Sequence, residues 1–260
     1  MSSSAGSEGS GVVARSGVVA ASGSKEPSLR LGSGVMFDAI AERYDLLNRI
    51  ISLGIDQIWR RRAVNALALG SKPRVLDVAT GTADLAILIA AMHANARVDG
   101  VDPSTKMLEF GVRKVREEAL DDRVALRVGE CESLPFDDAS FDGATIAFGI
   151  RNVADRPRGL SELRRVVRPG GRVVVLELSE PEGGVLGKLA KFHVHEVVPF
   201  VGGLLSGSRE YRYLQASIAA FPPPERFSDL MREAGLEVEA VLPQTFGVAH
   251  IFVGRVPEVA

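Results

Sequence analysis

Residues Pro73 to Asp84 read PRVLDVATGTAD, an apolar run with one acidic residue that continues into small residues. Because Val and Leu suit a buried, pleated surface, the segment Arg74 to Val78 is predicted to be a short strand. Gly81 permits a tight turn, and the apolar run Leu85 to Met92 predicts a helix. A strand, a small-residue loop and a helix N-terminus favour a nucleotide-type site, since exposed N–H groups and the helix dipole face the ligand. The same pattern also occurs as plain structure, so the rest of the chain must decide.

Composition indicates a globular, enzyme-sized protein. The 260 residues are 46% hydrophobic and carry a net charge of −2, so no global basic excess argues for a nucleic-acid partner. The single cysteine, Cys131, excludes an intrachain disulfide framework and a multi-cysteine zinc site, which fits a reducing, cytoplasmic compartment. No uninterrupted apolar run reaches the roughly 20 residues of a membrane-spanning helix. We therefore expect a soluble protein, at most peripheral to a membrane.

The N-terminal part of the chain divides into two regions. Residues 1–30 are dominated by Ser, Gly, Ala and Val without periodicity, and we expect a disordered extension; a cleaved targeting peptide is the alternative. Residues 31–260 are expected to form one domain. From Val35 to Leu69 apolar residues recur at helical spacing, which predicts helices that either pack on a sheet or cover a ligand site.

Strands and helices alternate through the centre of the chain. Such alternation predicts an α/β fold, a doubly wound and mostly parallel sheet whose binding crevice lies at the C-terminal ends of the strands. Two final strands joined by a turn containing Pro243 and Gly247 add an antiparallel hairpin and bring the expected total to seven. The further expected strands are Arg97–Val101, Arg123–Val128, Phe141–Ala147, Arg172–Leu178 after the turn Pro169-Gly170-Gly171, Leu236–Leu242 and Val248–Val253; the helices are Ser104 to about Leu120, Asp155–Val167 and Glu225–Ala234.

The segment from about 181 to 215 breaks this rhythm and is expected to be an insertion. Its Phe, Leu and Val residues alternate with glycines, which favours a channel for an apolar substrate over an internal packing layer. His193 and His195 suggest a metal pair, but residues two apart on a helix point to different sides, and no acidic or cysteine cluster accompanies them. We therefore expect no metal, and keep a single histidine base as a lesser alternative.

Two aspartates are expected at adjacent strand ends beside the small-residue loop. Asp102 lies 21 positions after Gly81, near the ~20 at which Rossmann-type sheets place a ribose-binding carboxylate. Its two oxygens are able to accept both ribose hydroxyls. Asp77 is expected either to orient the glycine-containing turn or to reach an ammonium group of the ligand. Together with Gly81 and Thr82, these residues form the expected ligand loop.

Residues after the third and fourth strands complete the expected crevice. Glu130 and Cys131 follow the third strand, where an adenine ring would lie, and Cys131 is expected to be a packed residue rather than a nucleophile. Arg151 and Asn152 follow the fourth strand. A guanidinium followed directly by an amide suits an oxygen-rich substrate.

Several motifs together resemble the ubiquinone/menaquinone biosynthesis C-methyltransferase family. The matching stretches cover about Met36 to Gly254 in the correct order. They are Tyr44-Asp45-Leu46-Leu47-Asn48 with Ser52 and Trp59, ESLPF at 132–136, FGIRNV at 148–153, RVVRPGG at 165–171 running on to Glu177 and Ser179, and Tyr211-Arg212-Tyr213-Leu214 with Ser217-Ile218 and Phe221-Pro222. A parallel sheet that ends in an antiparallel hairpin also resembles the S-adenosylmethionine-dependent methyltransferases rather than the nicotinamide dehydrogenases.

This chain departs from the family pattern at several positions. Ala83 replaces a glycine of the ligand loop, which is tolerable if the turn needs no positive φ there. The usual histidine near the C-terminus is Phe252, with His250 two residues earlier. These changes question any mechanism that depends on the lost side chains. Further departures are Leu47 for Met, Asp56 for His, Ala147 where a serine often contacts the cofactor, and Gln215-Ala216 for a Pro-Glu pair.

The resemblance implies C-methylation of a demethylated polyprenyl quinol with S-adenosylmethionine as donor and without a metal. For this reaction we expect a catalytic set of Arg151 and Asn152, to which the resemblance adds Tyr44. The expected methyl-donor site is made of Asp77, Gly81, Thr82, Asp102, Met107, Glu130, Cys131 and Ala147. We favour demethylmenaquinol over the benzoquinol of ubiquinone biosynthesis. Alternatives are a small-molecule O- or N-methyltransferase, a non-catalytic donor-binding partner subunit, and a nicotinamide dehydrogenase. The sequence leaves peripheral membrane contact and homodimer formation open.

Overall fold

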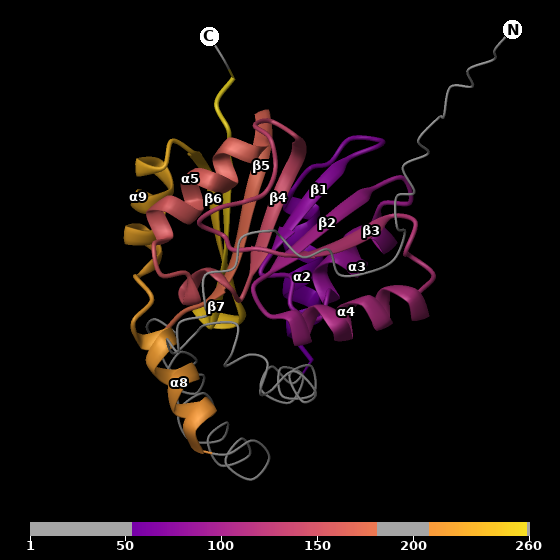
Figure 1. Ribbon diagram of the computed structural model, residues 1–260. Helices are drawn as coiled ribbons and strands as arrows, with labels where there is room; N and C mark the ends of the chain where they lie inside the picture. The colour runs from indigo at the N-terminus through magenta and orange to yellow at the C-terminus, as the bar shows by residue number, and fades with distance from the viewer. Residues whose placement is uncertain (1–53, 181–207, 259–260) are drawn as a thin grey trace, which may run out of the picture.

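The computed structural model describes residues 54–180 and 208–258, which form a seven-stranded sheet in the order β3-β2-β1-β4-β5-β7-β6 with helices on both faces (Figure 1). The strands are β1 (Arg74–Val78), β2 (Arg97–Asp102), β3 (Val124–Val128), β4 (Phe141–Ala147), β5 (Val167–Leu178), β6 (Glu237–Gln244) and β7 (Ala249–Arg255). The helices are α2 (Asp56–Ala66), α3 (Asp84–Met92), α4 (Thr105–Glu117), α5 (Arg156–Val166), α8 (Ser208–Ala219) and α9 (Pro224–Glu233), with the 3-10 turns η1 (Ile150–Asn152) and η3 (Thr245–Gly247).

Strands β1 to β5 pair in parallel, whereas β7 runs antiparallel to both β5 and β6. The predicted doubly wound sheet with a terminal antiparallel hairpin is therefore confirmed. The expected extension 1–30 and the apolar stretch 181–207 lie outside the described residues and stay predictions.

Each face of the sheet has its own hydrophobic core. Trp59 of α2 and Ile89 of α3 pack on one face, and Leu160 of α5 and Phe227 of α9 pack on the other. The central strands β1 and β4 are buried almost throughout, as expected of parallel strands covered on both faces. Ser104 caps α4 by accepting a hydrogen bond from the Met107 N–H at 3.1 Å, as its position before the apolar run predicted.

Three sequence predictions need correction. Strand β5 begins at Val167 rather than at Arg172, because the expected turn residues form an irregularity inside the strand, where Gly170 has a φ of 78°. Helix α8 occupies 208–219, part of which was expected to be an irregular insertion. Pro243 belongs to β6 instead of the hairpin turn, since β6 is the edge strand, where a missing N–H is tolerated.

The C-terminal ends of β1, β2, β4 and β5 meet at one edge of the sheet, which we call the crevice edge. The start of β7 reaches the same edge, because Ala249 pairs with Leu178 at the end of β5. Figure 1 shows this edge at the bottom of the molecule, with α8 beside it. Every site residue predicted from the sequence that the structure describes lies at or near this edge.

Candidate functional site

The loop after β1 alternates between left-handed and ordinary backbone. Ala79, Gly81 and Ala83 have φ values of 52°, 56° and 67°, and Thr80 and Thr82 lie between them. Ala83 was expected to be tolerable if the turn needs no positive φ at this position. That condition is not met, because the turn places Ala83 at positive φ. An L-residue there carries a conformational penalty of about 1–2 kcal/mol that glycine avoids.

Asp77 lies under this loop and fixes its shape. Its Oδ2 accepts a hydrogen bond from the Thr80 hydroxyl at 2.7 Å, and its Oδ1 accepts one from the Thr145 hydroxyl of β4 at 2.8 Å. The side chain is 1% exposed, and this burial raises the pKa of Asp77 to about 6 despite the two hydroxyl donors. Of the two predicted roles, orienting the turn is the one that its contacts display.

Asp102 ties the same loop to the end of β2. Its Oδ2 accepts the Gly81 N–H at 2.9 Å, and its Oδ1 accepts the Ser104 N–H at 2.8 Å. A carboxylate offers about four acceptor sites, and at this strand end it is the group that ligand hydroxyls would meet. A Cβ built on Gly81 would meet no atom within 4 Å in the described part of the chain, so a ligand is able to approach the backbone closely there.

The other residues predicted for the methyl-donor site lie around Asp77 and Asp102. Thr82 is 3% exposed, and its hydroxyl accepts a hydrogen bond from Lys114 at 3.2 Å. Met107 is buried in the first turn of α4. Ala147 is half-buried at the end of β4. Lys114 also pairs with Asp84, so a lysine of α4 bridges the loop and the start of α3.

Glu130 and Cys131 differ in their exposure. Glu130 is exposed and forms an isolated bridge with Ser133. Cys131 is 6% exposed in the core under α5, where its sulfur would lie 2.8 Å from a Cβ on Gly159. Burial and the nearby carboxylates of Glu132 and Glu162 raise the pKa of the Cys131 thiol well above its usual range. The cysteine is a packed, protonated residue, and a ligand would meet its backbone rather than its sulfur.

Arg151 forms a buried ion pair with Glu177 at the end of β5. Its Nη1 donates to Oε1 of Glu177 at 2.6 Å and to the carbonyl of Phe148 at 2.6 Å, while its backbone N–H donates to Oε2 at 3.1 Å. Arg151 is 9% exposed and Glu177 is fully buried. The guanidinium is therefore held at the crevice edge, as predicted, but its charge is balanced by a carboxylate.

Asn152 is joined to α8. Its Oδ1 accepts a hydrogen bond from the Tyr213 hydroxyl at 2.9 Å. Burial raises the pKa of Tyr213, so the phenol stays a donor at neutral pH. The predicted catalytic residue Tyr44 lies outside the described residues, as do His193 and His195.

Phe252, which stands at the usual histidine position of the family, and His250, two residues earlier, have different environments. Phe252 is fully buried and packs against Phe227, with ring centroids 4.7 Å apart. His250 is opposite Glu177 in the β5–β7 ladder, and its Nδ1 lies 2.6 Å from the Ser179 hydroxyl. The residue at the usual histidine position is thus a core residue in this chain, and the nearby histidine contacts the end of β5.

Helix α2 contributes residues to the same edge. Arg60 Nε donates to Oδ2 of Asp56 at 3.3 Å, and the guanidinium lies over the ring of Phe148 at 5.1 Å. Trp59 donates from its indole nitrogen to the Thr245 hydroxyl at 2.9 Å. Helix α2, the described part of the predicted helical region, therefore packs on the sheet and reaches the crevice edge.

Four residues make polar contacts in this site that were not predicted from the sequence: Glu177, Tyr213, Thr145 and Arg60. Glu177 carried a signal, because it is a lone acid near the end of the apolar run VVVLEL. An acid in a fully buried strand needs a partner, and that requirement points to a nearby arginine. The others gave no comparable signal.

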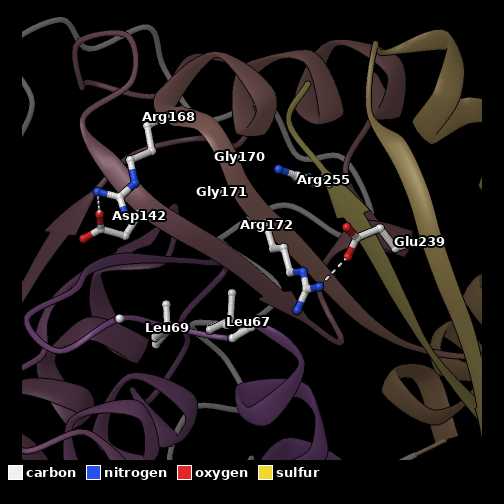
Figure 2. A pocket seen from close by; sticks show the side chains of 11 residues that line it. Leu67, Leu69, Asp142, Arg168, Gly170, Gly171, Arg172, Glu239 and Arg255 are labelled. Carbon is white, nitrogen blue, oxygen red and sulfur yellow. Dashed lines mark ion pairs between the residues drawn. The ribbon is translucent and has the colours of Figure 1, made fainter. Parts of the chain in front are cut away.

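A separate pocket of about 290 Å³ opens at the opposite edge of the sheet (Figure 2). Arg168 pairs with Asp142 on one wall, and Arg172 pairs with Glu239 at 2.7 Å on the other. Its arginines already have acidic partners, and none of the predicted site residues lines it. We therefore assign the chemistry to the crevice edge.

Comparisons with known proteins bear on the family of this chain. A family model described as the ubiE/COQ5 methyltransferase family matches residues 28–255. The demethylmenaquinone methyltransferase of Thermus thermophilus is 48% identical over 224 residues, covering 85% of this chain and 100% of that protein. The ubiquinone/menaquinone biosynthesis C-methyltransferase UbiE of Geobacter sp. strain M21 is 46% identical over 220 residues, covering 84% of this chain and 94% of that protein.

A solved structure supports the fold alone. A putative S-adenosyl-L-methionine-dependent methyltransferase from Methanococcus maripaludis superposes with a TM-score of 0.64 at 15% identity, covering 92% of this chain and 99% of that one. Within residues 54–180 and 208–258, no helix has the length and apolar character needed to cross a bilayer.

Proposed function

The chain belongs to the ubiE/COQ5 methyltransferase family, and from that premise we propose that it C-methylates demethylmenaquinol to menaquinol in quinone biosynthesis, using S-adenosylmethionine. The observation that carries the proposal is the meeting of two parts at the crevice edge. One is the loop fixed by Asp77 and Asp102, and the other is the arginine held by Glu177.

The residues present fit the methyl donor. The Asp102 carboxylate is an acceptor suited to ribose hydroxyls, and the space against Gly81 allows close approach to the loop backbone. The rest of the methyl-donor site would be lined by Thr82, Met107, Ala147 and the backbone of Glu130 and Cys131. When bound, S-adenosylmethionine supplies an already activated sulfonium methyl, so the protein mainly has to align the acceptor carbon with it.

Arg151 and Asn152 bind the ring oxygens of the quinol in this proposal. A ring carbon becomes nucleophilic as the neighbouring hydroxyl loses its proton, and a guanidinium that donates to the developing phenolate favours that loss. Because Glu177 balances the charge of Arg151, the arginine acts mainly as a positioned hydrogen-bond donor. Tyr44 joins this set through the family resemblance alone.

We further propose that the protein is cytoplasmic and touches the membrane that holds its lipid substrate through one apolar patch. Ile58, Leu242 and Phe246 are the large apolar side chains exposed in the described part of the chain, at 52%, 41% and 59%. Arg62 donates to Gln244 at 2.7 Å; Ile58 lies one turn before Arg62, and Leu242 shares a strand face with Gln244.

This patch adjoins η3 at the crevice edge, and the exposed Arg61 and Arg62 beside it suit an anionic bilayer. Sedimentation with phosphatidylcholine vesicles, with and without phosphatidylglycerol, tests the contact. We expect binding that increases with anionic lipid and falls when Phe246→Ser is introduced, while the distant Asp121→Ala control binds as the wild type does. Equal binding of all three proteins would contradict the contact.

Methyl transfer with labelled S-adenosylmethionine, offering demethylmenaquinol and the demethylated benzoquinol in competition, tests the proposed reaction. We expect both to be methylated at a ring carbon, with the naphthoquinol preferred. Preference for the benzoquinol would move the protein to ubiquinone biosynthesis. Donor binding without any turnover would favour a non-catalytic partner subunit.

A further inference from the structure

Arg60 is a buried cation at the crevice edge. It is 6% exposed, and its position in α2 places the guanidinium over the ring of Phe148, the first residue after β4. Its neighbours Arg61 and Arg62, by contrast, are exposed. A buried guanidinium is unusual unless its donors are used.

Few of the N–H groups of Arg60 make hydrogen bonds to residues in the described part of the chain. Arg60 Nε donates to Asp56 Oδ2 at 3.3 Å, a long contact from one of five N–H groups. Within residues 54–180 and 208–258, its two terminal nitrogens meet no hydrogen-bond acceptor. Four N–H donors in the planar fork that suits a carboxylate therefore remain available at a buried position.

The surroundings of Arg60 place it at one end of the donor site. The loops after β1 and β4 touch there, since a Cβ on Gly149 would lie 2.4 Å from the Cβ of Ala79. Asp77, at the end of β1, is also close enough for the charge of Arg60 to lower the pKa of its carboxyl group in part. Asp102, the expected ribose partner, lies on the other side of β1, at the end of β2. Consider a methyl-donor molecule whose ribose is bound at Asp102. If the rest of the molecule extends along the loop after β1 toward β4, its amino-acid end reaches Arg60.

We propose that Arg60 binds the carboxylate of the methyl donor, with Asp56 and Phe148 holding its guanidinium in place. This inference rests on the proposed function, because it assumes an S-adenosyl amino acid in the crevice. It separates Arg60 from Arg151, which lies toward β5 and is assigned to the quinol. The two arginines then recognise different substrates.

Calorimetric titration with three ligands tests the proposal without relying on turnover. S-adenosylhomocysteine carries the carboxylate, decarboxylated S-adenosylmethionine is the methyl donor without that group, and 5′-methylthioadenosine lacks the whole amino-acid end. In Arg60→Ala we expect S-adenosylhomocysteine to bind roughly 10- to 100-fold more weakly, the range of a lost charge-assisted hydrogen bond. The other two ligands should bind within about threefold of their wild-type affinity, an order-of-magnitude allowance for indirect effects.

Two further variants keep the test decisive. Arg61→Ala removes the exposed neighbouring arginine and should leave all three affinities unchanged. Arg60→Gln combined with Asp56→Asn removes both charges, so no aspartate is left buried without its partner, and it should reproduce the selective loss.

An equal loss for all three ligands, or no loss for S-adenosylhomocysteine, would overturn the role of Arg60. Failure of the wild-type protein to bind any of the three would instead refute the proposed function.

Discussion

The Gly81 N–H donates to Oδ2 of Asp102 over 2.9 Å, so the loop after β1 and the end of β2 form one unit. Asp102 also accepts the N–H of Ser104, the residue that caps α4. A single carboxylate thus organises the backbone of two neighbouring strand ends. Its role combines structure and binding, and a variant should reveal both.

Asp102→Ala is expected to weaken S-adenosylmethionine binding by about 1–3 kcal/mol, the range for hydrogen bonds to a charged group. The free energy of unfolding should also fall, because two backbone N–H groups lose their acceptor. Calorimetry and urea unfolding measure the two effects. Asp121→Ala, which removes an exposed acid, serves as the control and should change neither. Unchanged donor affinity would remove Asp102 from the binding site.

Glu177→Gln should lower turnover while leaving donor affinity near the wild-type value. Gln keeps the size of the side chain but removes the Glu177 carboxylate from the buried guanidinium of Arg151, and breaking such a pair destabilises by about 3–5 kcal/mol. Thermal unfolding and single-turnover methyl transfer test the two parts.

Arg151→Ala should lose turnover as well, by a factor on the order of 10²–10³ if it contacts the phenolate. Full activity of Arg151→Ala would contradict the assigned mechanism.

Asp77 is expected to make stability fall as the pH rises. Its pKa is raised from an ordinary 3.8 to about 6, so the folded protein holds this proton more tightly than the unfolded chain does. The contribution is complete below about pH 4 and is lost as the pH rises through about 6. The free energy of unfolding of the wild type, relative to Asp77→Asn, should therefore decrease by up to about 3 kcal/mol between pH 4 and 7. Urea unfolding across this range measures the difference, and an increase with pH would show that the hydroxyl donors outweigh burial.

Ala83 should respond differently to removal and to enlargement of its side chain. Ala83→Gly removes the conformational penalty of a left-handed residue. It also loses a buried methyl group worth about 0.8 kcal/mol, and it favours the unfolded chain by about 0.4–1 kcal/mol through added conformational entropy. The net change in the free energy of unfolding should therefore stay within about 1 kcal/mol. Ala83→Val should destabilise far more, because a β-branched residue resists positive φ. Denaturant midpoints for both variants check this contrast. A valine variant as stable as the wild type would contradict the left-handed backbone.

Much of the fold was predictable because it depends on local pattern. Strands β1 and β4 match their predicted bounds, and the cap at Ser104 follows from its place before an apolar helix. The error at the start of β5 has a specific cause. Gly170 and Gly171 carry the sequence signal of a turn, but pairing of Val167 with Phe141 extends the strand across them.

The site was predictable where a residue's position along the chain determines its role. Asp102 and Arg151 follow strands, so their place at one edge follows from topology. Their partners were harder to predict, because the Arg151–Glu177 contact joins residues 26 apart and Tyr213 reaches Asn152 from a helix that the sequence did not predict. Ala83 shows a further limit, since backbone φ at a single position cannot be inferred from residue type when alanine replaces glycine.

The position of β7 has a consequence for how the molecule is made. The last strand of the chain lies inside the sheet, between β5 and β6, rather than at its edge. Among the described strands, β5 therefore keeps one unpaired side during synthesis until Ala249–Arg255 has left the ribosome, and β6 has no neighbouring strand in this sheet before then. Nascent chains that stall before this point expose sheet hydrogen-bonding groups, and they are the species for which a chaperone or a protease would compete.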